Sequence, residues 1–121
     1  MGLAKTHKDL FAWQEAMRLV EIVYRDTSAF PGDETFGLRT QIRRAAVSVP
    51  SNIAEGAART SSRELAQYLS IARGSLSELE TQLELARRVG LLPEITDSTK
   101  QLDRVGRLVT ALHKSVLKRA A

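Results

Sequence analysis

The clearest helix of the sequence lies in residues 61–90, SSRELAQYLSIARGSLSELETQLELARRVG. Ser61 precedes Glu64 by three residues, which is the spacing of a capping box at a helix start. Gly90 follows two arginines and a valine, and a glycine after a basic last turn is typical of a helix end. The central pair Gly74-Ser75 is small enough to let a neighbouring helix come close. Apolar residues recur at spacings of three and four, as on one helix face, at Leu65, Tyr68, Leu69, Ala72, Leu76, Leu79, Leu83 and Ala86.

The same apolar spacing is present upstream of this stretch. A first helix of about 20 residues is predicted to begin after Lys8 and to end before the turn Phe30-Pro31-Gly32-Asp33. Asp33 is also placed to cap the helix that follows. The seam of the first helix repeats every seven residues, as in helices that pack along one side. Its members are Leu10, Trp13, Met17, Val20, Tyr24 and Thr27.

Two more helices complete the pattern. One is predicted from Glu34 to about residue 57, with a kink at Pro50, because the proline ring removes a backbone donor and clashes with the preceding turn. The other has Pro93 in its first turn and runs nearly to the C-terminus. Four helices joined by short turns favour an antiparallel up-down four-helix bundle. The apolar positions of these two helices are Phe36, Leu38, Ile42, Ala45, Ala46, Val49, Ile53, Ala54 and Ala57, and Leu102, Val105, Val109, Leu112 and Val116.

Length and composition fit this bundle. The chain has 121 residues and is 43% hydrophobic, which is enough for one compact domain and too little for two. It contains no cysteine, so disulfides, thiolate metal sites and a cysteine nucleophile are excluded. No apolar run has the length of a membrane span, and the first residues do not resemble a signal peptide. We therefore expect one cytoplasmic all-α domain over residues 1–121, not bound to a membrane, with residues 1–8 flexible.

Motifs that carry chemistry are scarce. The two histidines, His7 and His113, do not form the Glu-x-x-His pairs of a di-metal bundle, and no phosphate-binding loop is present. The sequence predicts no cofactor, no metal and no small-molecule substrate. Two enzymatic alternatives stay open, because Arg107 and His113 have the Arg-x5-His spacing of HEPN-type helical ribonucleases, and His113 could accept a phosphoryl group. A chain with 13 arginines shows such a spacing readily by chance, so we expect a protein that is not an enzyme.

Basic residues form the most informative surface pattern of a chain with a net charge of +4. Residues 100–121 carry six cations against one acid, and spacings of three, four and seven place five of the six on one helix face. A second group of arginines precedes Pro50. Aromatic residues do not interleave with either group, which favours contacts to phosphates over base stacking. The predicted nucleic-acid contacts are Arg39, Arg43, Arg44, Lys100, Arg104, Arg107, Lys114 and Lys118.

Several blocks of the sequence together resemble a known bacterial family. They include Gln41-Ile42-Arg43-Arg44-Ala45-Ala46, Pro50-Ser51-Asn52-Ile53-Ala54-Glu55-Gly56 and Ile71-Ala72-Arg73-Gly74-Ser75-Leu76-Ser77-Glu78-Leu79-Glu80. From about residue 8 to residue 117, the chain is similar to the four-helix-bundle proteins encoded in 23S rRNA intervening sequences. The resemblance implies an antiparallel bundle that assembles as a homo-oligomeric ring, a pentamer, and no enzymatic activity. It also implies a likeness to the accessory bundle proteins of diversity-generating retroelements, which bind nucleic acid through basic surfaces.

The resemblance assigns no role to the polar residues of these blocks. We expect Asn52 to shape the kink at Pro50. Four other polar residues are expected to tie helices or subunits together, and these are Glu55, Arg59, Arg73 and Glu78. Two functions are compatible with the whole pattern. The first is a non-enzymatic oligomer that binds structured RNA or DNA through basic faces, and the second is a structural or protein-interaction module whose arginines pair subunits.

Overall fold

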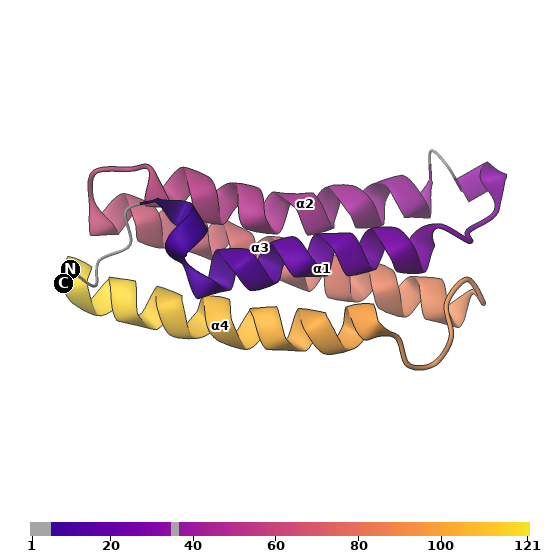
Figure 1. The fold of residues 1–121 in the computed structure, drawn as a ribbon. Coiled ribbons are helices and arrows are strands. Elements are labelled where there is room, and N and C mark those ends of the chain that lie inside the picture. The colour runs from indigo at the N-terminus through magenta and orange to yellow at the C-terminus, as the bar shows by residue number, and fades with distance from the viewer. Residues whose placement is uncertain (1–5, 35–36) are drawn as a thin grey trace.

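The computed structural model describes residues 6–34 and 37–121. The chain forms four long helices, α1 (Phe11–Thr27), α2 (Leu38–Ala57), α3 (Ser62–Arg88) and α4 (Asp97–Ala120), and two short 3-10 helices, η1 (His7–Asp9) and η2 (Gly32–Glu34). Figure 1 shows the four long helices side by side, with the chain reversing its direction at each connection. The described residues contain no strand. The predicted all-α fold with four helices is confirmed.

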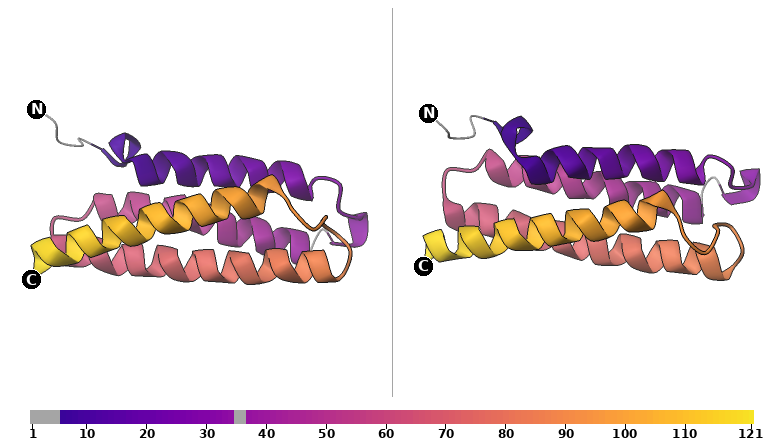
Figure 2. Two further views of the ribbon diagram at one scale, coloured as in Figure 1. Left: turned by 90° about the horizontal axis from the view of Figure 1, so that it is seen from below. Right: turned by 60° about the horizontal axis from the view of Figure 1, so that its bottom comes forward.

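Each long helix packs against two neighbours. α1 contacts α2 and α4, and α3 contacts the same two helices, while the two diagonal pairs do not touch in the described part of the chain. Figure 2 shows α4 lying between α1 and α3. None of the described helices is both long and apolar enough to cross a membrane. Of the segment expected to be flexible, residues 1–5 lie outside the described residues, whereas residues 7 and 8 belong to η1.

Both ends of α3 lie where predicted, with Ser61 as the N-cap but with only half of the capping box present. The Ser61 hydroxyl oxygen accepts a hydrogen bond from the backbone N–H of Glu64 at 3.1 Å, and the same hydroxyl donates to the Glu64 carboxylate at 3.1 Å. At the other end, Gly90 has a φ of 85°, in the left-handed region that favours glycine. This conformation lets the N–H of Leu91 donate to the carbonyl of Ala86 at 2.8 Å, which is one bond of a Schellman motif.

The predicted starts of α2 and α4 are wrong. Asp33 lies in η2, and α2 begins after Gly37, which makes no side-chain cap. Pro93 lies in the connecting loop, and α4 begins after Thr96, whose hydroxyl accepts a hydrogen bond from the N–H of Thr99 at 3.1 Å. Threonine supplies the side-chain acceptor that a helix start needs, whereas proline only tolerates the first turn. The predicted core residue Phe36 lies outside the described residues.

α2 continues without interruption through Pro50, which is buried. Two neighbouring side chains donate hydrogen bonds to carbonyls of the same helix. The Ser48 hydroxyl donates to the carbonyl of Ala45 at 3.0 Å, and the Asn52 amide donates to the carbonyl of Ser48 at 2.7 Å. Neither bond reaches the carbonyl of Ala46, four residues before Pro50, which is the acceptor that loses its usual N–H donor at a proline. The kink itself stays a prediction.

The seam predicted for α1 is partly wrong, because Leu10, Trp13 and Val20 pack against the core but are only half-buried. Of its members only Thr27 is buried, while Met17 and Tyr24 are 40% and 43% exposed. The core is instead formed by Ala12, Ala16, Leu19 and Val23. Both sets recur at spacings of three and four, so α1 carries two apolar stripes and periodicity alone does not say which one faces the core. The stripes predicted for α3 and α4 are confirmed, with Leu65, Tyr68 and Leu112 half-buried at their edges.

The close helix contact predicted at Gly74 is also wrong. A Cβ atom added at Gly74 would meet no atom within 4 Å. The close contact lies at Gly56, where an added Cβ atom would come within 2.8 Å of the Tyr68 Cβ and 2.9 Å of the Leu65 Cδ1. α2 and α3 therefore approach each other at Gly56, and Gly74 leaves the surface between α3 and α4 open.

A polar seam joins α1 to α4. Glu15 is buried on α1, and its carboxylate accepts hydrogen bonds from Arg104 Nε at 2.7 Å and from Gln101 Nε2 at 3.1 Å. Near the other end of α1, the Asp26 carboxylate accepts hydrogen bonds from the backbone N–H of Ser98, at 3.1 Å, and from its hydroxyl, at 2.7 Å. These bonds fix α4 against α1 and so determine which face of α4 remains outside.

The Glu15 contacts predict a pH-dependent stability. Hydrogen bonds from Gln101 and Arg104 lower the pKa of the Glu15 carboxyl below its ordinary value. Because the folded-state pKa is the lower one, the stabilisation is complete above the unfolded-state pKa and is lost as the pH falls through the folded-state pKa. We expect Glu15→Gln to reduce the free energy of unfolding by about 1 kcal/mol at about pH 6, and by less at about pH 3.

Urea unfolding of both proteins at the two pH values measures this difference. Glu21→Gln is the matched control, because Glu21 is an exposed α1 carboxylate with no ion pair to the described residues. A wild-type protein and a Glu15→Gln variant that lose the same stability between the two pH values would contradict the prediction.

Candidate nucleic-acid interface

The outer side of α4 carries five cations, which we call the α4 basic face. All five side chains are exposed, whereas the opposite side of the helix, formed by Leu102, Val105, Val109 and Val116, is buried. The grouping predicted from the spacing therefore lies on one solvent-facing side of the helix. The α4 basic face consists of Lys100, Arg104, Arg107, Lys114 and Lys118.

Carboxylates neutralise only two of these five cations. Arg104 pairs with Glu15 on α1, and Arg107 pairs with Asp103 one turn before it on α4. Within residues 6–34 and 37–121, Lys100, Lys114 and Lys118 form no ion pair. The three lysines therefore present positive charge to solvent that no carboxylate neutralises. The two arginines between Lys100 and Lys114 are already paired with carboxylates.

The arginine group of α2 has a different setting. Arg43 donates from Nε to the Thr27 hydroxyl oxygen at 2.9 Å and from Nη2 to the carbonyl of Tyr24 at 3.1 Å, and its guanidinium lies 4.3 Å from the centre of the Tyr24 ring. Arg43 thus ties α2 to the last turn of α1. Arg39 is half-buried, and Arg44 is exposed. Because α2 does not contact α4, the structure does not bring this group together with the α4 basic face.

The residues expected to act as ties make contacts within the chain. Glu55 and Arg59 form an ion pair at 3.6 Å, as their spacing predicts. Arg59 also donates to the Tyr68 hydroxyl oxygen at 2.6 Å and lies 5.0 Å from the centre of that ring. Asn52 bonds within α2 beside Pro50, as already described. Glu78 is exposed and has no ion pair in the described part of the chain. Roles between subunits stay predictions.

Arg73 contacts a second helix, as a polar tie within the chain would. It is on α3, exposed, and its Nη1 is 3.3 Å from Nδ1 of His113 on α4. Arg107, the proposed ribonuclease partner of His113, is bound to Asp103 instead. Arg107 and His113 are six positions apart in the helix, which places them about 120° apart around its axis. The ribonuclease hypothesis therefore gains no support from these contacts.

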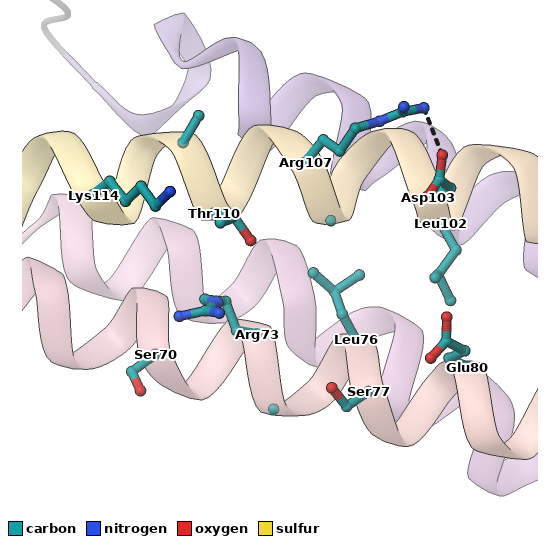
Figure 3. Close-up of a pocket in the computed structure, with 13 residues that line it drawn as sticks. Ser70, Arg73, Leu76, Ser77, Glu80, Leu102, Asp103, Arg107, Thr110 and Lys114 are labelled. Carbon is teal, nitrogen blue, oxygen red and sulfur yellow. Dashed lines mark ion pairs between the residues drawn. The ribbon is translucent and has the colours of Figure 1, made fainter.

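Two hollows lie end to end between α3 and α4. The first, of about 720 Å³, is lined by Arg73, Lys114 and Arg107 and is drawn in Figure 3; we call it the Arg73 groove. The second, of about 730 Å³, is lined by acidic residues around Arg87, and we call it the Glu84 hollow. They share one boundary, at Glu80, Leu102 and Asp103.

The arginine of the Glu84 hollow is fully engaged by carboxylates. Arg87 bonds Glu84 at 2.6 Å and Glu94 at 3.0 Å, and Arg88 bonds Glu84 at 2.9 Å. Hydrogen bonds from Arg87 and then Arg88 lower the pKa of Glu84 to about 2. The two hollows therefore differ, because Arg73 has no carboxylate partner among the described residues, although Arg107 in the same groove pairs with Asp103. No group of three or more side chains in those residues could hold a metal ion.

Comparison with known proteins agrees with the fold. The sequence matches the family described as 23S rRNA-intervening sequence protein over residues 8–111. That match spans α1, α2 and α3 and ends within α4, before Lys114 and Lys118. The chain matches no curated protein. With most of its length covered by one family, the chain belongs to the 23S rRNA-intervening sequence protein family.

Proposed function

We propose that the protein is a non-enzymatic cytoplasmic bundle that assembles with copies of itself and binds structured RNA or DNA through the α4 basic face. One observation carries this proposal. Lys100, Lys114 and Lys118 share an exposed helix face and lack carboxylate partners in the described residues. Exposed, uncompensated cations in a row are what a phosphate backbone attracts. α4 contains no aromatic residue, which favours backbone contacts over base stacking.

The length of the face suits a nucleic-acid backbone. Lys100 and Lys118 are 18 positions apart, which corresponds to about 27 Å along a helix at about 1.5 Å per residue. One strand of a duplex places a phosphate every ~3.4 Å along its axis. The face therefore spans enough backbone for each of its cations to meet a different phosphate.

The number of free cations predicts a salt dependence. If the three lysines contact phosphates, the logarithm of the binding constant should fall against the logarithm of salt concentration with a slope of about −2.7; contacts from all five cations give about −4.5. The measurement is binding of the purified protein to mixed cellular RNA and to duplex DNA between about 50 and about 200 mM salt. The molar mass of the same sample is measured by light scattering.

Binding with a slope in this range, by a protein of discrete oligomeric mass, is the expected result. If the oligomer forms but retains no RNA or DNA at the lowest salt concentration, the nucleic-acid proposal is wrong. In that case the basic residues are better explained as contacts between subunits, and the next experiment would look for protein partners.

A second candidate function, a protein-interaction module, is favoured by the surface of α1 and α2. Met17, Tyr24 and Val47 are 40%, 43% and 40% exposed, and Trp13 and Val20 beside them are half-buried. Apolar residues that recur along one outer helix face are typical of helix packing against another chain. In the proposed assembly this face contacts a second copy of the chain, with the pentamer as the expected ring. None of these residues belongs to the α4 basic face, so this proposal gives assembly and phosphate binding different residues.

A further inference from the structure

The Arg73 groove is open because two glycines lie in its walls. Gly74 belongs to α3 and Gly106 to α4, and a Cβ atom added at either one would meet no atom within 4 Å. Leu76 and Leu102 line the groove where the two helices pack, and both are buried. The result is a hollow of about 720 Å³ on the surface between the two helices.

Arg73 and Lys114 line this groove from the two helices, and neither has a carboxylate partner among the described residues. The two carboxylates of the lining, Glu80 and Asp103, lie at the boundary with the Glu84 hollow, and Asp103 pairs with Arg107. Among the residues that the structure describes, Arg73 makes one hydrogen-bond contact, between its Nη1 and Nδ1 of the His113 ring at 3.3 Å. Lys114 forms no ion pair with those residues. By contrast, Arg87 in the neighbouring Glu84 hollow is neutralised, because Glu84 and Glu94 both form ion pairs with it. Positive charge left unpaired in a hollow between helix walls attracts an anion from solvent.

We propose that the Arg73 groove binds one phosphate group, with Arg73 and Lys114 supplying the charge and the Thr110 and Ser70 hydroxyls as further donors. Figure 3 shows Arg73 and Lys114 on the two walls of the groove, with the Thr110 hydroxyl between them. A guanidinium presents paired N–H donors that match two phosphate oxygens, and an ammonium adds a point charge. The four side chains together offer the donors that a phosphate anion needs.

This inference rests on the proposed function, because it identifies the phosphate as one of a nucleic-acid backbone. Arg107 and Lys114 line the groove and also belong to the α4 basic face. A backbone that follows the face from Lys100 to Lys118 therefore passes the mouth of the groove. A free phosphorylated compound has the same chemistry at the phosphate and is the alternative source.

Titration with inorganic phosphate, followed through the guanidinium and amide signals in NMR spectra, tests the site directly. Arg73→Gln and Lys114→Gln are each expected to weaken phosphate binding at least about fivefold, because each removes a charge-assisted contact. Arg63→Gln is the matched control, since Arg63 is exposed on the same helix and does not line the groove. Its effect should stay below about twofold. Equal weakening in all three variants would mean a general charge effect and would overturn the site.

A steric variant tests whether binding needs the open space of the groove as well as its charge. Gly106→Leu places a side chain into the open space without changing the net charge, and it is expected to abolish phosphate binding while the helical spectrum is retained. Unchanged phosphate binding in a folded Gly106→Leu protein would overturn the proposal.

Binding of a duplex RNA identifies the source of the phosphate. Weaker duplex binding by Arg73→Gln and Gly106→Leu, compared with Arg63→Gln, supports a backbone phosphate. If these variants lose inorganic phosphate but bind the duplex normally, the groove takes a free phosphorylated compound and the backbone assignment is wrong. A third outcome is that the double variant Lys100→Gln with Lys118→Gln lowers duplex binding while Arg73→Gln and Gly106→Leu change the binding of neither inorganic phosphate nor the duplex. In that case the groove inference fails and the proposed function stands. A wild-type protein that binds no duplex overturns both.

Discussion

Replacing Gly56 with alanine is expected to lower the free energy of unfolding by about 2 kcal/mol. The added Cβ would lie 2.8 Å from the Tyr68 Cβ and 2.9 Å from the Leu65 Cδ1. The Leu65 terminus can rotate away, but the Tyr68 Cβ is fixed to the α3 backbone, so α2 and α3 must separate. Gly56 is the second-last residue of α2, so the gain in helix propensity from alanine is small there.

Gly74→Ala is the matched control, and its expected effect has the opposite sign. Gly74 lies in the interior of α3, and an added Cβ meets no atom within 4 Å. Alanine should therefore raise the free energy of unfolding by about 0.5–1 kcal/mol through helix propensity alone. Chemical denaturation followed by circular dichroism measures both variants. Two substitutions with the same sign would contradict the assignment of the close helix contact to Gly56.

The two glycines also show what sequence alone can predict. Spacing along one helix is a local property, so the four helices, the cap at Ser61, the end at Gly90 and the apolar stripe of α4 were accessible from the sequence. Whether a glycine faces a neighbour depends on where the other helices lie. Gly74 and Gly56 are both small residues in helical segments, and only the packing distinguishes the closed contact from the open groove.

The same limit explains the face of α1 that was predicted incorrectly. α1 carries one stripe with small alanines and another with Trp13, Met17 and Tyr24. Large apolar side chains are the usual sign of a core, but Ala12 and Ala16 allow the closer approach of neighbouring helices, and the structure buries them. Met17 and Tyr24 remain at the surface, where the proposed assembly would cover them, whereas Trp13 packs against the edge of the core.

The candidate interface was predictable in part for the same reason. Five cations on one side of a single helix follow from their spacing. Contacts between helices cannot be predicted from spacing within one helix. Arg104 binds Glu15, 89 positions away in the chain, and Arg43 binds Thr27 on another helix. Arg73 and Lys114 come from different helices, and nothing in the local sequence indicates that they line one groove. Charge pattern alone thus overestimated how many of the arginines are free to bind a ligand.

Reversing two charges at the end of α4 is expected to have the largest effect on nucleic-acid binding. Lys114→Glu with Lys118→Glu removes two proposed phosphate contacts and adds repulsion, so the affinity should fall on the order of 10- to 100-fold, and the salt slope should become shallower by about 1.8. The double change takes the net charge from +4 to 0. Lys8→Glu with Arg63→Glu makes the same change in charge on η1 and α3, at residues that are not part of the α4 basic face, and is the matched control.

The molar mass of the charge-reversed protein separates the two candidate functions. Lys114 and Lys118 are exposed and unpaired within the described residues, and α4 does not contact α2, which carries part of the apolar outer surface. Light scattering should therefore give the wild-type mass while binding is lost, since the proposal assigns the two activities to different residues. If the mass falls and the affinity for nucleic acid does not, these lysines hold subunits together. The α4 basic face would then be an assembly surface, and the protein an interaction module.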